Sequence, residues 1–304
     1  MKIVAKNITK IFDSKVIIDN ASFEIEAGEI VGLIGPNGAG KTTVMKMLVG
    51  LLKYESGEIC YDNKDIYGNF DDYISKVGCS IETPSFYPYM TGKKNLECVT
   101  KLYDENEILN EIKDILEIDK YIGKKVSKYS LGMKQRLGVC RAFAGTPKLV
   151  ILDEPTNGLD VEGIIEFREK IRLIAKKYNI SILISSHNIK EIEEICDRVL
   201  MINDKKIEEI YTKTILDYVT YRVETQNTDI TKKLLNKIGG IRVVSDENGL
   251  IINDSNPRGL VLKQLITMGD EVYAWEKQSY DLETQYIEKV KAKKDEKTEK
   301  DRDC

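Results

Sequence analysis

The stretch Gly35-Pro36-Asn37-Gly38-Ala39-Gly40-Lys41-Thr42 decides the fold of this chain. It follows an apolar run at residues 29–34 and opens an amphipathic run at 41–49 that Gly50 closes, so we expect it to connect a buried strand to a helix. Its glycines let successive N–H groups point at one anion, and the start of the helix adds positive potential. The GxxxxGK[ST] pattern therefore predicts a phosphate-binding loop.

Two side chains of this loop predict how a nucleoside triphosphate is held. Lys41 is expected to bridge the β- and γ-phosphates, and the Thr42 hydroxyl is placed for Mg²⁺, a hard cation that prefers oxygen ligands. The predicted nucleotide-contacting residues of this region are Gly35, Pro36, Asn37, Gly38, Ala39, Gly40, Lys41, Thr42 and Thr43. The pattern alone leaves kinases, GTPases and ATPases open.

A second signal is an apolar strand that ends in two acids, Leu149-Val150-Ile151-Leu152-Asp153-Glu154. Ligand chemistry in open α/β sheets gathers at the carboxyl ends of strands. An adjacent acid pair is by itself usually a solvated strand end, but together with the phosphate loop it fits a Walker B element. Asp153 would then hold the Mg²⁺ shell opposite Thr42, and Glu154 would polarise an attacking water near the γ-phosphate.

The chain has a single histidine, His187, which follows another predicted strand, 180–184, through the polar pair Ser185-Ser186. One histidine excludes a multi-histidine metal centre. The strand order along the sequence places this imidazole at the same sheet edge as Glu154, where it is predicted to hydrogen-bond the transferring phosphoryl group.

Composition excludes several other classes. Apolar residues make up 42% and charged residues 32%, an ordinary globular balance. The 46 basic and 50 acidic residues give a net charge of −4, so nucleic acid is not expected as a partner. We find no apolar run approaching about 18 residues, so the chain is not expected to cross a bilayer. Six cysteines without a CxxC pair predict reduced thiols rather than a zinc site or a disulfide framework.

Strands that alternate with longer helical stretches predict an α/β fold of P-loop NTPase type, with a parallel-rich sheet. We expect a nucleotide-binding domain over residues 1–212, with an inserted helical subdomain at about 80–145. Its helices are predicted at 92–103, at 105–118 and from about Leu131.

A small C-terminal α+β domain is predicted over 213–290, followed by a disordered charged tail at 291–304. The predicted strands and helices of this domain alternate in the split βαβ order. The strands are expected at 221–225, 241–244, 250–253 and 271–276, and the helices at 229–238, 257–268 and 280–291.

Over about residues 1–211 the chain resembles the ATP-binding cassette of ABC transporters. The discriminating stretch is Tyr129-Ser130-Leu131-Gly132-Met133-Lys134-Gln135-Arg136. It is similar to the ABC signature, with Leu131 in place of the first glycine of the usual LSGGQ core, Tyr129 in place of its leucine and Met133 in place of its glutamine. A helix that begins at such a motif offers a second anion site.

The resemblance implies that Ser130 and Gly132 complete the ATP site of a second copy docked head to tail. Pro155-Thr156-Asn157-Gly158-Leu159-Asp160 is similar to the D-loop that follows the seam of such a dimer, which adds Asp160 to the nucleotide-site residues. Phe12 takes the aromatic position that stacks on adenine in the family, although a single phenylalanine near a strand is equally a core residue.

The chain departs from most cassettes at Glu82, where the family has a glutamine that contacts Mg²⁺ and water. A carboxylate at that position would bring extra negative charge to the metal. Glutamate followed by proline and aromatic residues resembles the variant loop of bacterial cassettes that export lantibiotics and bacitracin-like peptides. Its aromatic residues, Phe86, Tyr87 and Tyr89, are either ordinary core or a groove for a permease helix.

The resemblance therefore implies an ATP- and Mg²⁺-binding ATPase on the cytoplasmic face of a bacterial membrane. It would energise export of, or resistance to, peptide antibiotics through separate permease subunits. An exporter of another drug or lipid-like substrate, a soluble ABC ATPase that acts on DNA or ribosomes, and a module that holds ATP without turnover remain alternatives. A kinase or GTPase would leave Ser130 to Arg136 unexplained.

Overall fold

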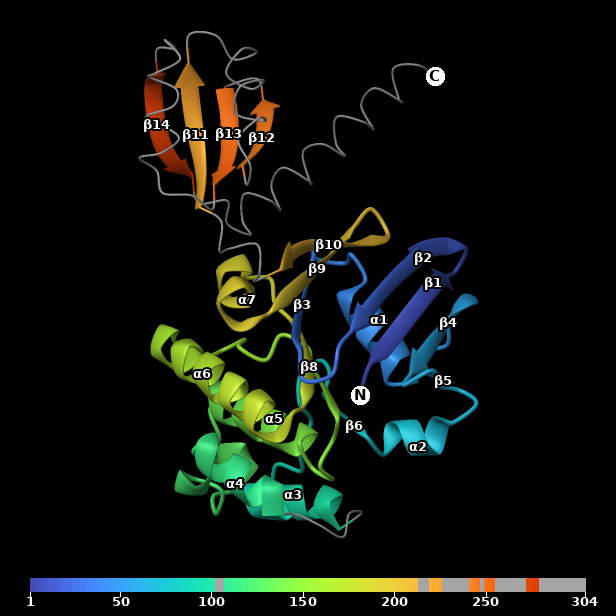
Figure 1. The fold of residues 1–304 in the computed structure, drawn as a ribbon. Coiled ribbons are helices and arrows are strands. Elements are labelled where there is room, and N and C mark those ends of the chain that lie inside the picture. The colour runs from blue at the N-terminus through green and yellow to red at the C-terminus, as the bar shows by residue number, and fades with distance from the viewer. Residues whose placement is uncertain (102–106, 213–218, 226–240, 247–248, 255–271, 279–304) are drawn as a thin grey trace. The chain divides into compact units, whose positions relative to one another are not determined.

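The computed structural model describes residues 1–101, 107–212, 219–225, 241–246, 249–254 and 272–278 (Figure 1). Contacts divide the chain into two compact units, one that contains Met1–Tyr211 and one within Thr212–Lys291. Within the described residues, no helix combines the length and the apolar character needed to span a membrane, and the five cysteines are free thiols.

A six-stranded sheet in the order β10-β9-β3-β8-β7-β6 forms the centre of the first unit. The pairs β3–β8, β3–β9, β7–β8 and β6–β7 are parallel. The bounds are β3 Ile30–Ile34, β6 Val77–Ser80, β7 Leu149–Leu152, β8 Ser181–Ser185, β9 Arg198–Asn203 and β10 Lys206–Thr212. Every residue of β3, β7 and β8 is buried, as expected for parallel strands covered on both faces. The predicted parallel-rich sheet is confirmed.

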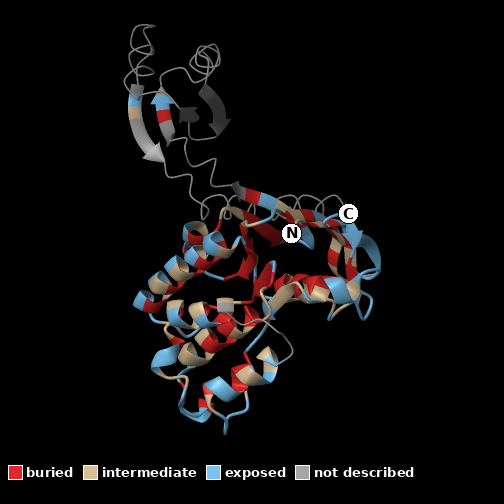
Figure 2. Ribbon diagram, turned by 60° about the horizontal axis from the view of Figure 1, so that its bottom comes forward, coloured by how far each residue is buried: buried red, intermediate tan, exposed pale blue. Residues whose placement is uncertain are grey.

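A second, antiparallel sheet in the order β2-β1-β4-β5 lies beside it. Its strands are β1 Ile3–Phe12, β2 Lys15–Ile25, β4 Ser56–Tyr61 and β5 Lys64–Asp65. Helix α1, Lys41–Leu48, buries Val44, Met45, Met47 and Leu48 in a core that residues of both sheets share. Figure 2 shows the buried residues gathered along these strands and α1. The helix that the phosphate loop opens is thus anchored by its apolar side chains, while Thr42, Thr43 and Lys46 remain partly exposed.

The remaining helices of the first unit cover the sheet and extend beyond its β6 edge (Figure 1). Four begin at a side chain that accepts a hydrogen bond from a first-turn N–H: Thr91 for α3, Ser130 for α5, Asp160 for α6 and Asn188 for α7. Such caps satisfy N–H groups that the helix leaves unpaired. The bounds are α2 Phe70–Ile74, α3 Gly92–Thr100, α4 Glu107–Ile115, α5 Leu131–Ala142, α6 Val161–Tyr178 and α7 Ile189–Ile195.

The second helix of the predicted helical subdomain is shorter than expected. It ends at Ile115 rather than 118, because Glu117 adopts a left-handed φ of 58°. A short 3₁₀ turn, Ile118–Lys120, follows, and a second one spans Val126–Lys128 just before the signature stretch. The predicted end of the preceding helix, 101–103, lies partly outside the described residues.

The second unit contains an antiparallel sheet in the order β12-β13-β11-β14. Its strands are β11 Val219–Thr225, β12 Ile241–Asp246, β13 Gly249–Asp254 and β14 Val272–Gln278, which confirms the four predicted strand positions. The predicted helices at 229–238, 257–268 and 280–291 and the tail lie outside the described residues.

Candidate functional site

The phosphate loop connects β3 to α1 and presents the start of that helix. Gly40 precedes α1 with a φ of 110°, and no side chain caps the first turn of the helix. A Cβ at Gly40 would lie 3.1 Å from the side chain of Ile17 and 3.0 Å from that of Ile18. The loop therefore needs glycine here for both backbone angle and space, and it leaves the first N–H groups of α1 for an anion.

Lys41 lies folded over this loop. It is only 8% exposed, and its Nζ donates to the carbonyl oxygen of Gly35 at 2.8 Å and to that of Pro36 at 3.3 Å. The ammonium group is thus held within the loop that is expected to receive phosphate. A phosphate group would replace these neutral carbonyl acceptors with charged ones, which form stronger hydrogen bonds with an ammonium.

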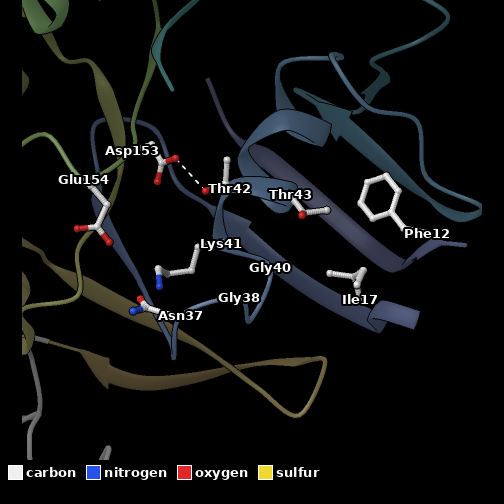
Figure 3. Close-up of a pocket in the computed structure, with 10 residues that line it drawn as sticks. All are labelled: Phe12, Ile17, Asn37, Gly38, Gly40, Lys41, Thr42, Thr43, Asp153 and Glu154. Atoms are coloured by element: carbon white, nitrogen blue, oxygen red, sulfur yellow. Dashed lines mark hydrogen bonds between the residues drawn. The ribbon is translucent and has the colours of Figure 1, made fainter. Parts of the chain in front are cut away.

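Thr42 and Asp153 meet across the carboxyl edge of the sheet (Figure 3). Thr42 Oγ1 donates to Asp153 Oδ2 at 2.9 Å, and Ser185 Oγ donates to Asp153 Oδ1 at 2.6 Å. The hydroxyl and carboxylate oxygens match the ligand chemistry of Mg²⁺, which is usually held by one or two protein oxygens together with nucleotide phosphates. The described residues contain no group of three or more His, Cys, Asp or Glu side chains able to hold a metal.

Glu154 and His187 form the second contact at this edge. His187 Nδ1 lies 2.7 Å from Glu154 Oε2, and the His187 backbone N–H donates to the same oxygen at 3.3 Å. The Glu154 backbone adopts a left-handed φ of 49° and its N–H donates to Ser185 Oγ at 2.9 Å. The two residues that the sequence predicts to act near the γ-phosphate therefore touch each other.

A cavity of about 320 Å³ joins these groups. Its lining consists of Phe12, Ile17, Asn37, Gly38, Gly40, Lys41, Thr42, Thr43, Asp153 and Glu154. Figure 3 shows Phe12 and Ile17 on the opposite side of the cavity from the two acids. Phe12 is 40% exposed and lies beneath Lys10, whose Nζ is 4.7 Å from the ring centre. The aromatic ring is thus a partly exposed part of the cavity wall, and the ammonium group of Lys10 lies over one of its faces.

Glu82 does not line this cavity. Its carboxylate pairs with Lys46 Nζ at 2.5 Å, and its side chain is 64% exposed. Lys46 lies one helical turn beyond Thr42 on α1, so the pair sits beside the predicted metal position rather than in it. The backbone of Glu82 adopts a left-handed φ of 61°.

The signature stretch forms a separate location at the start of α5. Ser130 Oγ accepts from the Met133 N–H at 3.2 Å, and Asp160 Oδ1 accepts from the Gly163 N–H at 2.9 Å. Leu131 is 51% exposed and packs on Gly158, and a Cβ at Gly132 would lie 2.9 Å from Leu159. None of these residues lines the cavity at Lys41, and their assignment to a second phosphate position stays a prediction.

Together, a phosphate loop, a hydroxyl–carboxylate pair and a glutamate beside a histidine define a P-loop nucleotide-binding protein. A sequence-family model described as ABC transporter matches residues 18–157. YhcH, an uncharacterized ABC transporter ATP-binding protein of Bacillus subtilis (strain 168), is 32% identical over 297 residues, 96% of each chain. The chain therefore belongs to the ATP-binding proteins of ABC transporters and is an ATPase of that class.

Relatives with named functions are also similar. The bacitracin transport ATP-binding protein BcrA of Bacillus licheniformis is 39% identical over 228 residues, which cover 73% of this chain and 74% of BcrA. The lantibiotic transport ATP-binding protein SrtF of Streptococcus pyogenes is 39% identical over 207 residues, 66% of this chain and 87% of SrtF. A solved ATP-binding subunit of an ABC transporter is 25% identical with a TM-score of 0.63, covering 71% of this chain and 92% of that subunit.

Sequence reasoning missed the role of Ser185. Its hydroxyl is buried and links the Asp153 carboxylate to the backbone of Glu154. The sequence did contain a signal for this role. Ser185 stands at the carboxyl end of a buried strand, as Asp153 does, and polar residues at such strand ends are candidates for the site. Lys46 was missed because its partner depends on where the loop after β6 places Glu82.

The contact of Leu131 with Gly158 gives a steric prediction. Gly158 has a φ of 81°, and a Cβ there would lie 2.3 Å from Leu131 Cδ2. We expect Gly158→Ala to lower the free energy of unfolding by about 2–3 kcal/mol, from the left-handed backbone and the clash together. Combining it with Leu131→Ala should recover the steric part and leave about 1 kcal/mol of backbone cost.

Denaturant unfolding measures both variants. Gly123→Ala is the control, because nothing lies within 4 Å of a Cβ there, and it should change stability by less than about 0.5 kcal/mol. If Gly158→Ala lowered the free energy of unfolding by the same amount with Leu131 and with Leu131→Ala, the steric explanation would be wrong.

Proposed function

We propose that this chain is the ATP-hydrolysing subunit of a bacterial exporter that moves peptide antibiotics of the bacitracin or lantibiotic type, or confers resistance to them. The observation that carries the enzymatic part is the contact of Glu154 with His187 next to the Thr42–Asp153 pair. The substrate class is supported by the names of BcrA and SrtF and by Glu82 in place of the usual glutamine.

In this proposal Thr42 and Asp153 hold Mg²⁺, which when bound neutralises charge on the ATP phosphates. Lys41 turns from the carbonyl oxygens of Gly35 and Pro36 to the phosphates, and the N–H groups from Gly38 to Thr43 surround them. Phe12 stacks on the adenine. The cavity in front of these residues then contains the triphosphate, with Glu154 at its far end.

Glu154 accepts a proton from the attacking water, and His187 holds that carboxylate in place through its ring nitrogen and its backbone N–H. The left-handed backbone of Glu154, fixed by Ser185, directs the side chain toward the cavity. A general base positioned in this way contributes about 10²–10⁴-fold to a rate. The imidazole is 63% exposed, so it also remains accessible to the transferring phosphoryl group.

A second copy of the chain completes the site. Ser130 and Gly132 at the start of α5 and Asp160 at the start of α6 are the residues that we assign to the nucleotide of the partner copy. The exposed apolar residues of this face include Leu131, which is 51% exposed, and Val161, which is 76% exposed. ATP binding then closes the two copies head to tail, and hydrolysis reopens them.

The surface next to Glu82 is the proposed contact with the permease subunits, on the cytoplasmic face of the membrane. Tyr87 is 62% exposed, Tyr89 is 84% exposed and Met90 is 39% exposed. Phe86, by contrast, stacks under Arg141, whose guanidinium carbon is 4.8 Å from the ring centre. The permease contact is therefore assigned to the two tyrosines and the methionine, with Phe86 as their support.

Glu154→Gln tests the enzymatic role. The amide keeps the size of the side chain but removes the base, so steady-state ATP hydrolysis should fall by about 100-fold or more. ATP binding should remain, and the variant should accumulate as a dimer with ATP, measured by sedimentation. Hydrolysis at the wild-type rate would remove Glu154 from the general-base role.

The Lys46–Glu82 pair predicts how Mg²⁺ dependence responds to charge. Lys46→Met leaves the Glu82 carboxylate without its cation, so the Mg²⁺ concentration for half-maximal hydrolysis should fall by about 3-fold, a size typical of partly exposed ion pairs. Glu82→Gln should move it in the opposite direction, and the double variant should lie near the wild type. The exposed pair Lys6–Glu58, neutralised in the same way, is the control and should leave Mg²⁺ dependence unchanged.

Susceptibility measurements test the substrate class. Cells that express this chain with its permease subunits should tolerate more bacitracin or lantibiotic than cells in which the chain carries Glu154→Gln. If both kinds of cell were equally susceptible to these peptides but differed in their susceptibility to another drug, the proposed peptide substrate would be wrong. The proposed ATPase role would still hold.

A further inference from the structure

Glu191 is a buried carboxylate in the first turn of α7, outside the cavity described above. It is 9% exposed. Its Oε2 accepts from Thr156 Oγ1 at 2.7 Å and from Ser186 Oγ at 3.3 Å, and its Oε1 accepts from Asn188 Nδ2 at 3.0 Å. Three neutral donors thus surround one charged acceptor, which is the arrangement that a buried carboxylate requires.

The three donors come from the two loops that carry the proposed catalytic pair. Thr156 lies two residues after Glu154, while Ser186 and Asn188 flank His187 on both sides. Thr156 is 7% exposed and Ser186 is 2% exposed, and the Asn188 N–H donates to Ser186 Oγ at 3.0 Å. A single side chain therefore joins the segment after β7 to the segment after β8.

Ser185 makes the corresponding link on the other side of the pair, since its hydroxyl accepts from the Glu154 N–H at 2.9 Å. The contact of Glu154 Oε2 with His187 Nδ1 at 2.7 Å lies between these two links. Ser185 joins the strand ends, and Glu191 joins the loops that follow them. With both links in place, the spacing between the two loops is fixed from both ends.

The chemistry of this link requires a carboxylate. An ionised carboxylate only accepts hydrogen bonds, which suits two hydroxyl groups and an amide NH₂. In glutamine of the same shape, one oxygen is replaced by NH₂. That NH₂ would either face the NH₂ of Asn188 or take the place of the oxygen shared by Thr156 and Ser186, and a buried donor would be left unsatisfied.

We propose that Glu191 is a positioning residue for ATP hydrolysis, which sets the distance between the Glu154 and His187 loops and thereby keeps the imidazole on the carboxylate. This inference rests on the proposed roles of Glu154 and His187. Glu191 does not line the nucleotide cavity, so it acts through the two loops and not on the nucleotide.

The unique histidine provides a direct test that needs no nucleotide. In protein labelled at histidine and purified without a polyhistidine tag, the imidazole of His187 gives a single NMR signal set. Glu154→Gln should shift it, and Glu191→Gln should shift it in the same direction. Thr156→Ser keeps the hydroxyl and should leave the signal in place, whereas Thr156→Val should move it. An unmoved signal in Glu191→Gln, with a clear shift in Glu154→Gln, would overturn the proposal.

Kinetics provides the second test. Glu191→Gln should lower kcat by about 10-fold, within the range of a misplaced general base, with KM for ATP changed less than about 2-fold because the phosphate loop is untouched. In a His187→Ala background the same substitution should cost less than about 2-fold, since residues that act as a unit are not additive. An equal cost in both backgrounds, or a loss of ATP binding and thermal stability, would mean a merely structural role.

The two tests separate the possible failures. A wild-type protein that binds ATP but does not hydrolyse it would overturn the proposed function, while the NMR comparison would still decide whether Glu191 holds the two loops together.

Discussion

The buried carboxylate of Asp153 is the interaction on which the nucleotide site depends. It is 8% exposed, so its charge is largely removed from water, and such burial is costly unless hydrogen bonds compensate. Thr42 from α1 and Ser185 from β8 supply them, at 2.9 and 2.6 Å. The same carboxylate therefore fixes the start of α1 relative to two strand ends before any nucleotide is present.

The strand order explains why three residues far apart in the sequence can make these contacts. In the central sheet β8 lies between β3 and β7, so Ser185 lies between the loop after β3 and the acids after β7. A parallel sheet brings the carboxyl ends of all three strands to one edge. The antiparallel sheet contributes the opposite wall, since Phe12 and Ile17 stand at the facing ends of β1 and β2. The cavity thus lies between two sheets, and both sheets pack against α1.

The sequence was sufficient to predict those elements that a local residue pattern specifies. The strand at 149–152 is found as predicted, and the strand ending at Ser185 is displaced by one residue from 180–184; continuous apolar runs bounded by polar residues specify buried strands well. The hydroxyl and acid of the Thr42–Asp153 pair were expected to face one another and do so. The roles of these residues in ATP hydrolysis remain predictions.

Long-range geometry could not be predicted in the same way. The pairing of β1 with both β2 and β4 depends on contacts between distant segments, and no single segment encodes it. Glu82 was expected to bring its charge to the metal, and its pairing with Lys46 was not predicted, because that contact depends on where the helical phase of α1 places the lysine. Glu191 was not recognised because a glutamate in a helix rich in acids resembles a solvated residue until its burial is known.

The segment from Glu154 to Asp160 links all these contacts and lies against the start of α5. Its beginning is fixed by Ser185 and His187, Thr156 is held by Glu191, and its end is the N-cap of α6. Asn157, Gly158 and Leu159 lie between Thr156 and Asp160, and Gly158 and Leu159 pack against Leu131 and Gly132 at the start of α5. Leu131 in place of the usual glycine therefore gives this chain a side chain through which the signature stretch contacts the loop that follows the proposed catalytic base.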